Sequence, residues 1–364
     1  MAPVVMKRTR PRCCYNKPAS ANEYGLILLR ATANGVKIWL ETPVVDLLGD
    51  ADAITGVVVH RDGADVEVHA AMVLLASGGF ERNQELREEY LPLPTEAAWS
   101  TSVETDTGDA IRLAVAKGAA TAELDAAWWR PVIMVDGVAH PLNDAREKPH
   151  SLIVDSVGDR FFDETIIDDA MGRAVYDRGF GVRAVPSFLI MDNRHRQQVA
   201  LGPWTAGNTP RKAIESGEIV RASTLNDLAE SLGIDRAGLI GTVVRFNGFA
   251  AKGKDLDFAR GESGVTGEGG KRRNPSLGKV DKQPFWAVRV YPGDAGTKGG
   301  LLIDADSRVL RADGQAIGGL YACGGVAASI FKRTSPGPGA ALGESLVQAF
   351  LAVTSGSRPA DSTD

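Results

Sequence analysis

The fold of this chain is decided near its C-terminus by two runs, Gly319-Leu320-Tyr321-Ala322-Cys323-Gly324-Gly325 and Thr334-Ser335-Pro336-Gly337-Pro338-Gly339-Ala340-Ala341-Leu342-Gly343-Glu344-Ser345. They predict a strand, a glycine-rich loop and the start of a helix. Glycines let the backbone approach a flat ring, and the N–H groups of a first helical turn suit the electron-rich N1/O2 edge of an isoalloxazine. From these residues alone, the alternative is an ordinary Gly/Pro-rich loop before a core helix.

Length and composition indicate a globular protein with two domains, or with one domain and a large insertion. The chain has 364 residues and a net charge of -5, so nothing in its charge favours a nucleic-acid partner. It has no apolar run of about 20 residues and no signal-peptide pattern, so we expect no membrane span and a cytoplasmic location. The three cysteines, with Cys13 adjacent to Cys14, match neither a disulfide framework nor a zinc site, and we expect no bound metal.

A complete dinucleotide-binding fingerprint is not found in this sequence. Such a Gly-x-Gly-x-x-Gly motif follows a strand, opens a helix and is followed about 20 residues later by an acidic residue. Gly337, Gly339 and Gly343 have a similar spacing, but they follow a long loop and no second strand with an acidic residue comes after them. We therefore interpret them as contacts to a flavin ring and expect an FAD-binding domain that is incomplete at its N-terminal side.

The first third of the chain has the pattern of an α/β domain. Helices are predicted over 22–34, 83–90 and 108–117, and strands over 36–41, 54–60 and 66–75, with Arg61-Asp62-Gly63 as the turn between the last two strands. The run Val73-Leu74-Leu75-Ala76 is nearly all apolar, as in a strand covered on both faces. It ends in Ser77-Gly78-Gly79-Phe80, at the position where an α/β sheet meets a cofactor.

From Trp128 onward the pattern changes to that of an α+β module. Helical periodicity covers 224–232 and 239–252, and 261–270 is predicted to be a loose surface loop. The earlier sheet pattern returns at 300–303, with Asp313-Gly314 as a turn. We therefore predict an interrupted domain made of residues 1–126 and 297–358, an inserted cap of residues 127–296 and a frayed tail of residues 359–364.

Several motifs resemble, in order and spacing, flavoproteins of the succinate dehydrogenase/fumarate reductase superfamily, and within it the 3-ketosteroid 1-dehydrogenase branch. The resemblance covers about residues 35 to 352. The motifs that carry it are Leu75-Ala76-Ser77-Gly78-Gly79-Phe80, Gly158-Asp159-Arg160-Phe161-Phe162-Asp163-Glu164, Gly296-Thr297-Lys298-Gly299-Gly300 and the C-terminal runs quoted above. It implies a glutathione-reductase-like α/β FAD-binding domain with an inserted α+β cap domain.

The resemblance also implies a cofactor, a substrate and an electron acceptor. It implies FAD bound non-covalently, and substrate hydride transferred to flavin N5 while a protein base removes a neighbouring proton, leaving a C=C bond. The substrate would be an apolar, steroid-like ketone. The residues implied to bind the cofactor are Val44 and Val45 beside the adenine, Ser77, Gly78 and Gly79 near the ADP portion, and Gly299, Gly300, Gly324, Gly339, Ala340, Ala341 and Leu342 along the flavin.

The candidate catalytic residues are Ser335, Gly339, Tyr291 and Asp168. Ser335 stands where the steroid enzymes have a tyrosine heading Tyr-Pro-Gly-x-Gly, and its hydroxyl can donate a hydrogen bond to a carbonyl. Asp168 lies where those enzymes have a tyrosine base, and Tyr176 is an alternative to it. Tyr291, just before the Thr297 motif, is the remaining phenol that we expect to line the site.

Two alternative functions stay open from the sequence. A fumarate reductase-like enzyme would need arginines that clamp a dicarboxylate, and Arg333 is the nearest candidate for that role. The other alternative is a truncated, non-catalytic fragment that does not bind FAD alone, since the first βαβ unit supplies the pyrophosphate site. For assembly, the expectation is an oligomer or a second, complementing chain.

Overall fold

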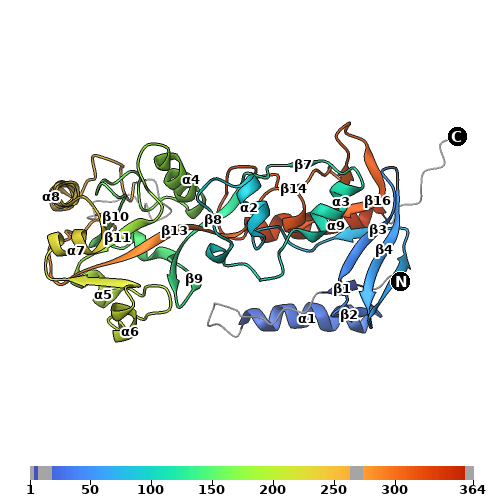
Figure 1. Ribbon diagram of the computed structural model, residues 1–364, viewed down its shortest axis with the longest axis horizontal. Coiled ribbons are helices and arrows are strands. Elements are labelled where there is room, and N and C mark those ends of the chain that lie inside the picture. The colour runs from blue at the N-terminus through green and yellow to red at the C-terminus, as the bar shows by residue number, and fades with distance from the viewer. Residues whose placement is uncertain (1–3, 7–18, 263–273, 357–364) are drawn as a thin grey trace. The chain divides into compact units, whose positions relative to one another are not determined.

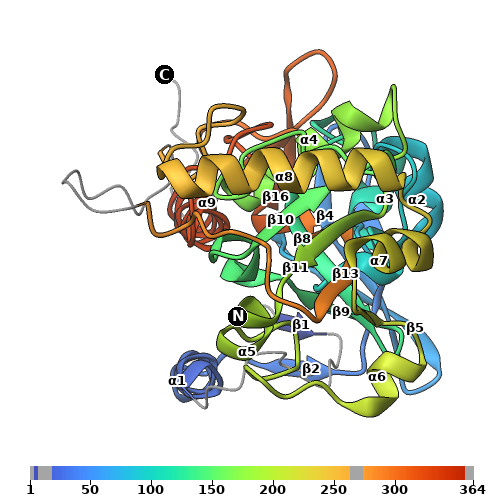
Figure 2. The same ribbon diagram turned by 90° about the vertical axis from the view of Figure 1, so that its left-hand side faces the viewer.

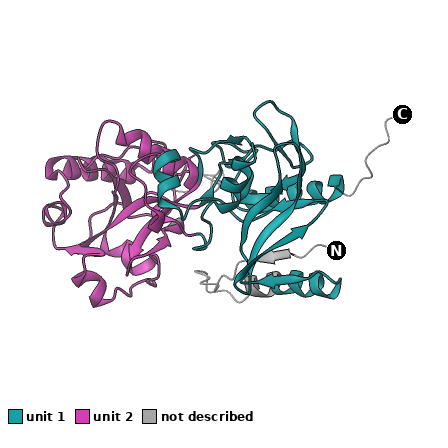
Figure 3. Cartoon of the chain, turned by 45° about the vertical axis from the view of Figure 1, so that its right-hand side comes forward, with its two compact units in different colours: residues 1–91, 102–127, 296–364 teal, residues 92–101, 128–295 magenta. Residues whose placement is uncertain are grey.

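The computed structural model describes residues 4–6, 19–262 and 274–356, which form two compact units (Figures 1 and 3). Unit 1 contains the described residues up to Leu91, residues 102–127 and the described residues from Gly296 onward. Unit 2 contains residues 92–101 and the described residues between Trp128 and Ala295. The loop predicted at 261–270 lies almost wholly outside the described residues, and so does the predicted tail at 359–364.

Unit 1 is built from short strands and a few helices. Its strands are β1 (Val4–Met6), β2 (Ile38–Leu40), β3 (Val44–Gly49), β4 (Ile54–Arg61), β5 (Ala64–His69), β6 (Val73–Leu75), β7 (Thr121–Ala122), β14 (Gly300–Leu301), β15 (Arg308–Leu310) and β16 (Ala316–Ala322). Its helices are α1 (Ala19–Ala33), α2 (Gln84–Tyr90), α3 (Asp109–Ala116), the 3₁₀ helix η3 (Gly324–Val326) and α9 (Ala340–Gly356).

The centre of unit 1 is the parallel pair of β6 and β16. Leu320, Tyr321 and Ala322 lie opposite Val73, Leu74 and Leu75, and β15 adds an antiparallel strand on the far side of β16. Val73, Leu75, Leu320 and Ala322 are buried, as the apolar sequence of both strands predicts. Because parallel strands end at the same sheet edge, the turn after β6 and the glycines after β16 emerge side by side.

Unit 2 contains a six-stranded sheet. Its strands are β8 (Ala127–Val135), β9 (Val138–Pro141), β10 (Ser151–Val154), β11 (Ser187–Met191), β12 (Ile219–Ala222) and β13 (Phe285–Thr297), with order β10-β11-β13-β8-β9 and β12 also paired to β13. Its helices are α4 (Asp168–Gly179), α5 (Asn193–Gln198), α6 (Arg211–Glu215), α7 (Leu225–Leu232), α8 (Arg236–Lys252), and the 3₁₀ helices η1 (Ala97–Trp99) and η2 (Asn143–Glu147). Figure 2 shows α8 on one side of this sheet and α5 and α6 on the other.

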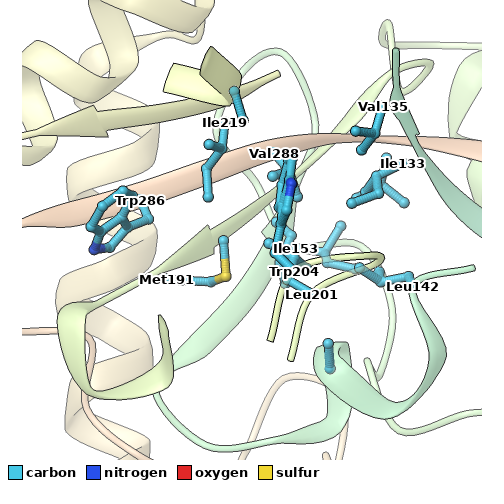
Figure 4. Packing of buried hydrophobic residues seen from close by; sticks show 14 of the residues in the cluster. Ile133, Val135, Leu142, Ile153, Met191, Leu201, Trp204, Ile219, Trp286 and Val288 are labelled. Carbon is cyan, nitrogen blue, oxygen red and sulfur yellow. The ribbon is translucent and has the colours of Figure 1, made fainter. Parts of the chain in front are cut away.

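The sheet of unit 2 is covered on both faces, and alternate residues of strand β11 are buried in two different hydrophobic clusters. Phe188 and Ile190 of β11 belong to the cluster that includes residues of α7 and α8. Leu189 and Met191, pointing the other way, join the cluster of Trp204, Trp286 and Val288 (Figure 4). A strand that is buried on both faces is expected to be apolar throughout, and residues 188–191 of β11 are all apolar.

Local sequence signals explain where the helices of unit 2 begin and end. The Thr224 side chain accepts a hydrogen bond from Asp227 N and Gly233 ends α7 with φ 70°, a left-handed conformation that suits glycine. Asp235 caps α8 in the same way, by accepting from Gly238 N, and Gly253 ends it. The helix predicted from residue 239 therefore begins three residues earlier, immediately after this cap.

Three other expectations differ from the structure. The predicted strand 66–75 is two strands, β5 and β6, because residues 70–72 leave the β4–β5 hairpin before β6 begins. Val44 and Val45 lie on a strand, β3, that was not predicted. The predicted first domain, 1–126, includes residues 92–101, which lie in unit 2 because Thr101 N donates to the Asp294 carbonyl (2.8 Å) and the Trp99 ring packs on Tyr291.

Candidate functional site

Three segments of unit 1 meet around the turn that follows β6. Phe80 N donates a hydrogen bond to Thr297 Oγ1 (3.2 Å). A Cβ atom placed on Gly79 would lie 2.0 Å from that same oxygen, and one placed on Gly325 would lie 2.8 Å from Gly79 N. The Gly78–Gly79 turn therefore contacts both the Thr297 segment and the glycines after β16, and only glycine fits at these contacts.

A buried carboxylate holds this junction together. Glu81, 2% exposed, accepts hydrogen bonds at Oε2 from Thr297 N and Thr297 Oγ1, each at 3.1 Å. A fourth segment is joined by the backbone, since Gly108 N donates to the Gly79 carbonyl (2.9 Å) just before α3. The end of the turn is thus fixed by a residue far away in the sequence, since Phe80 and its acceptor Thr297 are 217 positions apart.

Gly299 and Gly300 are required by the packing of the chain itself. A Cβ on Gly299 would lie 2.3 Å from Leu124 Cα, and a Cβ on Gly300 would lie 2.4 Å from the Val326 carbonyl oxygen. Both neighbouring atoms are backbone, so they do not rotate away. These glycines bring β14 against β7 and the segment after η3.

The loop that carries Ser335 is tied to the same junction by a buried lysine. Lys298, 1% exposed, donates from Nζ to the Thr334 carbonyl (2.8 Å). Ser335 Oγ accepts a weak hydrogen bond from Gly337 N (3.3 Å), which leaves its own O–H proton to be donated elsewhere. Arg333 forms an ion pair with Asp125.

The first turn of α9 has the features that a flavin edge needs. No described residue accepts a hydrogen bond from the amides of Ala341 and Leu342, while Gly343 N bonds to the Gly339 carbonyl (2.9 Å). Cβ atoms on Gly337, Gly339 and Gly343 would meet nothing within 4 Å. Open space beside unpaired helix N-terminal amides fits the electron-rich side of an isoalloxazine.

The helix α9 is apolar on its outer side. Its opposite side is buried at Gln348 and Ala352, and Gly324 N donates to Gln348 Oε1 (2.8 Å), which anchors the helix to η3. Five large apolar side chains on α9 are more than half exposed: Leu342, Leu346, Val347, Phe350 and Val353.

The substitution Gly343→Ala tests two things separately: whether Gly343 is packed against the rest of the chain, and whether it contacts the cofactor. A helical glycine with open space around its Cβ position is less favourable than alanine, so this change should stabilise the chain without cofactor by about 0.5 to 1 kcal/mol. If a flavin ring lies along Gly343, the same methyl group should weaken FAD binding. Thermal unfolding and FAD titration of the same sample measure both effects, and a variant with reduced stability would show that Gly343 is packed.

The remaining predicted cofactor residues lie on β3 and at η3. Val44 pairs with Val59 across β3 and β4, and Val45 is 41% exposed. Gly324 has φ 70°, a conformation that favours glycine, at the start of η3. Their contact with adenine and flavin stays a prediction.

In unit 2, the structure distinguishes the two candidate bases, Asp168 and Tyr176, from Tyr291, the phenol predicted to line the site. Asp168 Oδ1 accepts from Arg146 Nη2 (2.7 Å), and Tyr176 is buried, with its hydroxyl donating to the Pro94 carbonyl (3.3 Å). Tyr291 packs its ring on Trp99, with centroids 5.0 Å apart, and among the described residues its hydroxyl has no hydrogen-bond partner. Tyr291 is thus the candidate whose phenol is not already occupied within unit 2.

The Gly158 to Glu164 motif forms a buried ionic cluster in unit 2. Arg160 Nη2 contacts Glu164 Oε2 (2.6 Å) and Asp255 Oδ2 (2.9 Å), and Arg260 Nη1 lies 3.3 Å from Glu164 Oε2. Burial opposes ionisation of Glu164, yet the charges of Arg160 and Arg260 outweigh it and its pKa is lowered. Arg160 also lies over the Phe246 ring, 4.9 Å from its centroid. This family motif is a structural element of unit 2.

Sequence reasoning missed Glu81 and the role of Lys298. Each stands directly beside a motif that was recognised: Glu81 follows Gly78-Gly79-Phe80, and Lys298 lies between Thr297 and Gly299. An acidic residue immediately after a buried strand and its glycine turn was the available signal. The contacts that give these residues a role join distant parts of the chain, so spacing did not reveal them.

Among residues 4–6, 19–262 and 274–356, no helix combines the length and the hydrophobicity that a membrane-spanning segment requires. No cluster of three or more His, Cys, Asp and Glu side chains in the same residues is arranged to hold a metal ion.

Comparison with known proteins identifies a matching family and several proteins that are similar to this chain. The family described as FAD binding domain matches residues 8–342. A 3-oxosteroid 1-dehydrogenase of Mycolicibacterium smegmatis is 36% identical over 333 residues, 87% of this chain and 58% of that protein. A 4-oxocyclohex-2-ene-1-carboxylate 5-dehydrogenase of Sinomonas cyclohexanicum is 33% identical over 346 residues, 90% of this chain and 58% of that protein.

A solved structure shows the same fold. The 3-ketosteroid delta1-dehydrogenase from Sterolibacterium denitrificans, in complex with 1,4-androstadiene-3,17-dione, superposes with a TM-score of 0.84 at 37% identity, over 90% of this chain and 61% of that chain. The chain thus spans less than two thirds of the length of these relatives. The predicted superfamily, branch and α/β fold class are confirmed.

Proposed function

We propose that this chain, which belongs to the FAD binding domain family, is part of an FAD-dependent dehydrogenase that forms a C=C bond beside the ketone of a steroid-like substrate. The observation that carries the proposal is the junction in unit 1. There the Gly78–Gly79 turn, Thr297 and Gly325 lie in contact, at the edge where a parallel sheet of this class binds its ligand.

When bound, FAD supplies the acceptor for the hydride that the substrate loses. The residues of the chain then have three tasks. The amides of Ala341 and Leu342 would hold the pyrimidine side of the ring and stabilise negative charge there, because no described residue accepts a hydrogen bond from these two donors at a helix N-terminus. Lys298 fixes the Ser335 loop through the Thr334 carbonyl, and Ser335 donates its O–H to the substrate ketone, which makes the neighbouring C–H more acidic.

We propose Tyr291 as the acceptor of that proton. The supporting observation is that the other two candidates are engaged within unit 2: Asp168 by Arg146, and Tyr176 by the Pro94 carbonyl. A phenol with an ordinary pKa near 10 is a suitable general base only when its proton can leave, so a hydroxyl with no described partner is favoured.

The experiment is a spectrum and an assay of the purified chain. Flavin absorbance bands after incubation with FAD, together with reduction of an artificial electron acceptor by a 3-ketosteroid, would support the proposal. A chain that binds FAD but oxidises no steroid would contradict the substrate class. Fumarate as electron acceptor tests the other branch, which the ion pair of Arg333 with Asp125 disfavours, since that guanidinium is already bound.

A second candidate function is a flavin-side module that holds FAD only together with further sequence. Two observations favour it: the chain spans 58% of the first relative's length, and α9 has five exposed apolar side chains. On this alternative the purified chain is colourless after incubation with FAD, and it gains flavin absorbance when a chain carrying the remaining part of a relative's FAD-binding domain is added.

Ser335→Ala tests the proposed hydrogen bond to the ketone. Loss of one donor to a developing enolate typically lowers turnover by about 100-fold, and FAD content should stay unchanged because, within the described part of the chain, Ser335 Oγ bonds only to Gly337 N. Steady-state kinetics and flavin absorbance measure the two quantities. Ser335→Thr, which keeps a hydroxyl, is the matched control, and equal turnover in the alanine variant would remove Ser335 from the site.

A further inference from the structure

Residues 92–101 form a short segment of unit 2 that lies against β13. Thr101 N and Thr101 Oγ1 both donate to the Asp294 carbonyl, at 2.8 and 2.9 Å. A Cβ placed on Gly293 would lie 2.4 Å from the Trp99 carbonyl oxygen, so only glycine fits at this close approach. The backbone of the segment is therefore fixed beside β13 at neighbouring positions, and these contacts determine where Trp99 stands.

The side chain of Trp99 is packed within unit 2 as well. Trp99 is 9% exposed and belongs to one apolar cluster with Val132 and Ala139, which are also buried. Its ring lies on the ring of Tyr291, with centroids 5.0 Å apart and planes 32° apart. Aromatic pairs at such separations are stabilised beyond the area that they bury. Trp99 is therefore a well-packed support in direct contact with the Tyr291 ring.

The Tyr291 side chain depends on packing for its direction. Its neighbours in β13, Val290 and Pro292, are buried, whereas Tyr291 is only partly buried. Among the described residues, the Tyr291 hydroxyl has no hydrogen-bond partner. A tyrosine side chain turns about two bonds, so a ring without a hydrogen bond at its tip is held by the contacts of the ring itself. The contact with Trp99 therefore decides where the Tyr291 oxygen points.

We propose that Trp99 is a positioning residue, which fixes the Tyr291 ring so that its phenolate oxygen can take the proton that the substrate loses. The inference rests on the proposed function, in which Tyr291 is the acceptor of that proton. Proton transfer requires the two groups to lie within hydrogen-bond reach, and a displacement of about 1 Å can lower a rate about 100-fold. Trp99 touches neither substrate nor FAD in this proposal and acts only through Tyr291.

The chain without cofactor shows whether Trp99 holds Tyr291. Trp99→Leu keeps an apolar side chain but removes the ring that covers the phenol. Tetranitromethane nitrates the ring carbons beside a tyrosine hydroxyl, and peptide mass spectrometry measures this reaction at Tyr291 separately from the other tyrosines. We expect nitration of Tyr291 to become several-fold faster in Trp99→Leu, and to stay close to the unmodified rate in Trp99→Phe, which keeps an aromatic ring.

Trp204→Leu is the matched control for general loss of stability. Trp204 is 6% exposed and lies in the separate cluster that includes Met191 and Val288 (Figure 4). Its replacement should lower the melting temperature, as that of Trp99 does, but leave nitration of Tyr291 unchanged. NMR of the unmodified chain with labelled tyrosine needs no folded Trp99 variant. The Tyr291 ring signals, identified by their loss in Tyr291→Phe, should be displaced by the ring current of Trp99.

Steady-state kinetics with FAD and a 3-ketosteroid show whether this contact matters for the reaction. Trp99→Leu should lower kcat about 100-fold with little change in KM, and Trp99→Phe should keep most of the activity. In a Tyr291→Phe background, Trp99→Leu should cause no further loss, because a residue that acts only through Tyr291 has no phenol left to position.

Three results would overturn the proposal: equal nitration of Tyr291 in Trp99→Leu and the unmodified chain, Tyr291 ring signals at the positions of a free tyrosine, or a second loss of kcat when Trp99→Leu is added to Tyr291→Phe. Full turnover of Tyr291→Phe would refute the proposed base, and with it the catalytic role of Trp99. Reduced turnover of Tyr291→Phe beside a fully active Trp99→Leu would refute this inference alone. If the chain binds no FAD, its proposed function fails, and the nitration rates decide whether Trp99 fixes the phenol.

Discussion

Replacing Gly300 by alanine is expected to destabilise unit 1 by about 3 kcal/mol or more, a large effect for one methyl group. The added Cβ would lie 2.4 Å from the Val326 carbonyl oxygen and 2.7 Å from its carbonyl carbon. Neither atom can rotate away, because β14 is paired with β7 and Leu301 is bridged to Ala327. Urea unfolding of the two proteins, followed by circular dichroism, measures the difference.

Gly343→Ala is the matched control for this prediction, since it adds the same methyl group in the same unit where nothing lies within 4 Å. The two variants should differ in sign. Equal stability of Gly300→Ala and the unmodified chain would mean that β14 and the segment after η3 lie farther apart than described.

Glu164→Gln should cost about 3 to 5 kcal/mol of stability, measured by urea unfolding at pH 7, because it leaves Arg160 and Arg260 buried without their shared counter-charge. The lowered pKa of Glu164 means that its contribution is fully present above the ordinary pKa of 4.5 and is lost as pH falls through the lowered value. The unmodified chain should therefore lose stability on acidification more steeply than the variant.

The control for Glu164 is Glu215→Gln, the same substitution in an exposed pair with Arg211. That change should alter stability by less than about 0.5 kcal/mol, because exposed ion pairs are screened by water and salt. If Glu164→Gln were as mild as the control, the buried cluster would hold water or would share its charge differently, and the Gly158 to Glu164 motif would need another explanation.

The parts of the fold that could be predicted are those encoded by short, local sequence patterns. The apolar run before Ser77, the strand that ends at Ala322 and the helix that begins at Ala340 are confirmed, because apolar strands, glycine turns and helix starts are encoded within a few residues. The helices α7 and α8 were found for the same reason, and each has a capping side chain at its start.

The parts that were missed depend on contacts between distant residues. The alternation of apolar and polar residues in β3 is weak, and the strand is held in place by its pairing with β4. Glu81 stabilises the glycine turn through the hydrogen bond that it accepts from Thr297. Of the candidate site, the sequence indicated the glycine segments but not Glu81, the buried carboxylate that accepts hydrogen bonds from Thr297. Substitution of the expected tyrosine by Ser335 was visible at once, whereas the anchoring of its loop by Lys298 was visible only in the structure.

The outer side of α9 also determines how a sample of this chain will behave. Leu342, Leu346 and Phe350 form a row of exposed aliphatic and aromatic side chains, and such a patch favours association between copies of a chain. We therefore expect concentrated preparations to associate through this helix while remaining folded, and a mild detergent to disperse them.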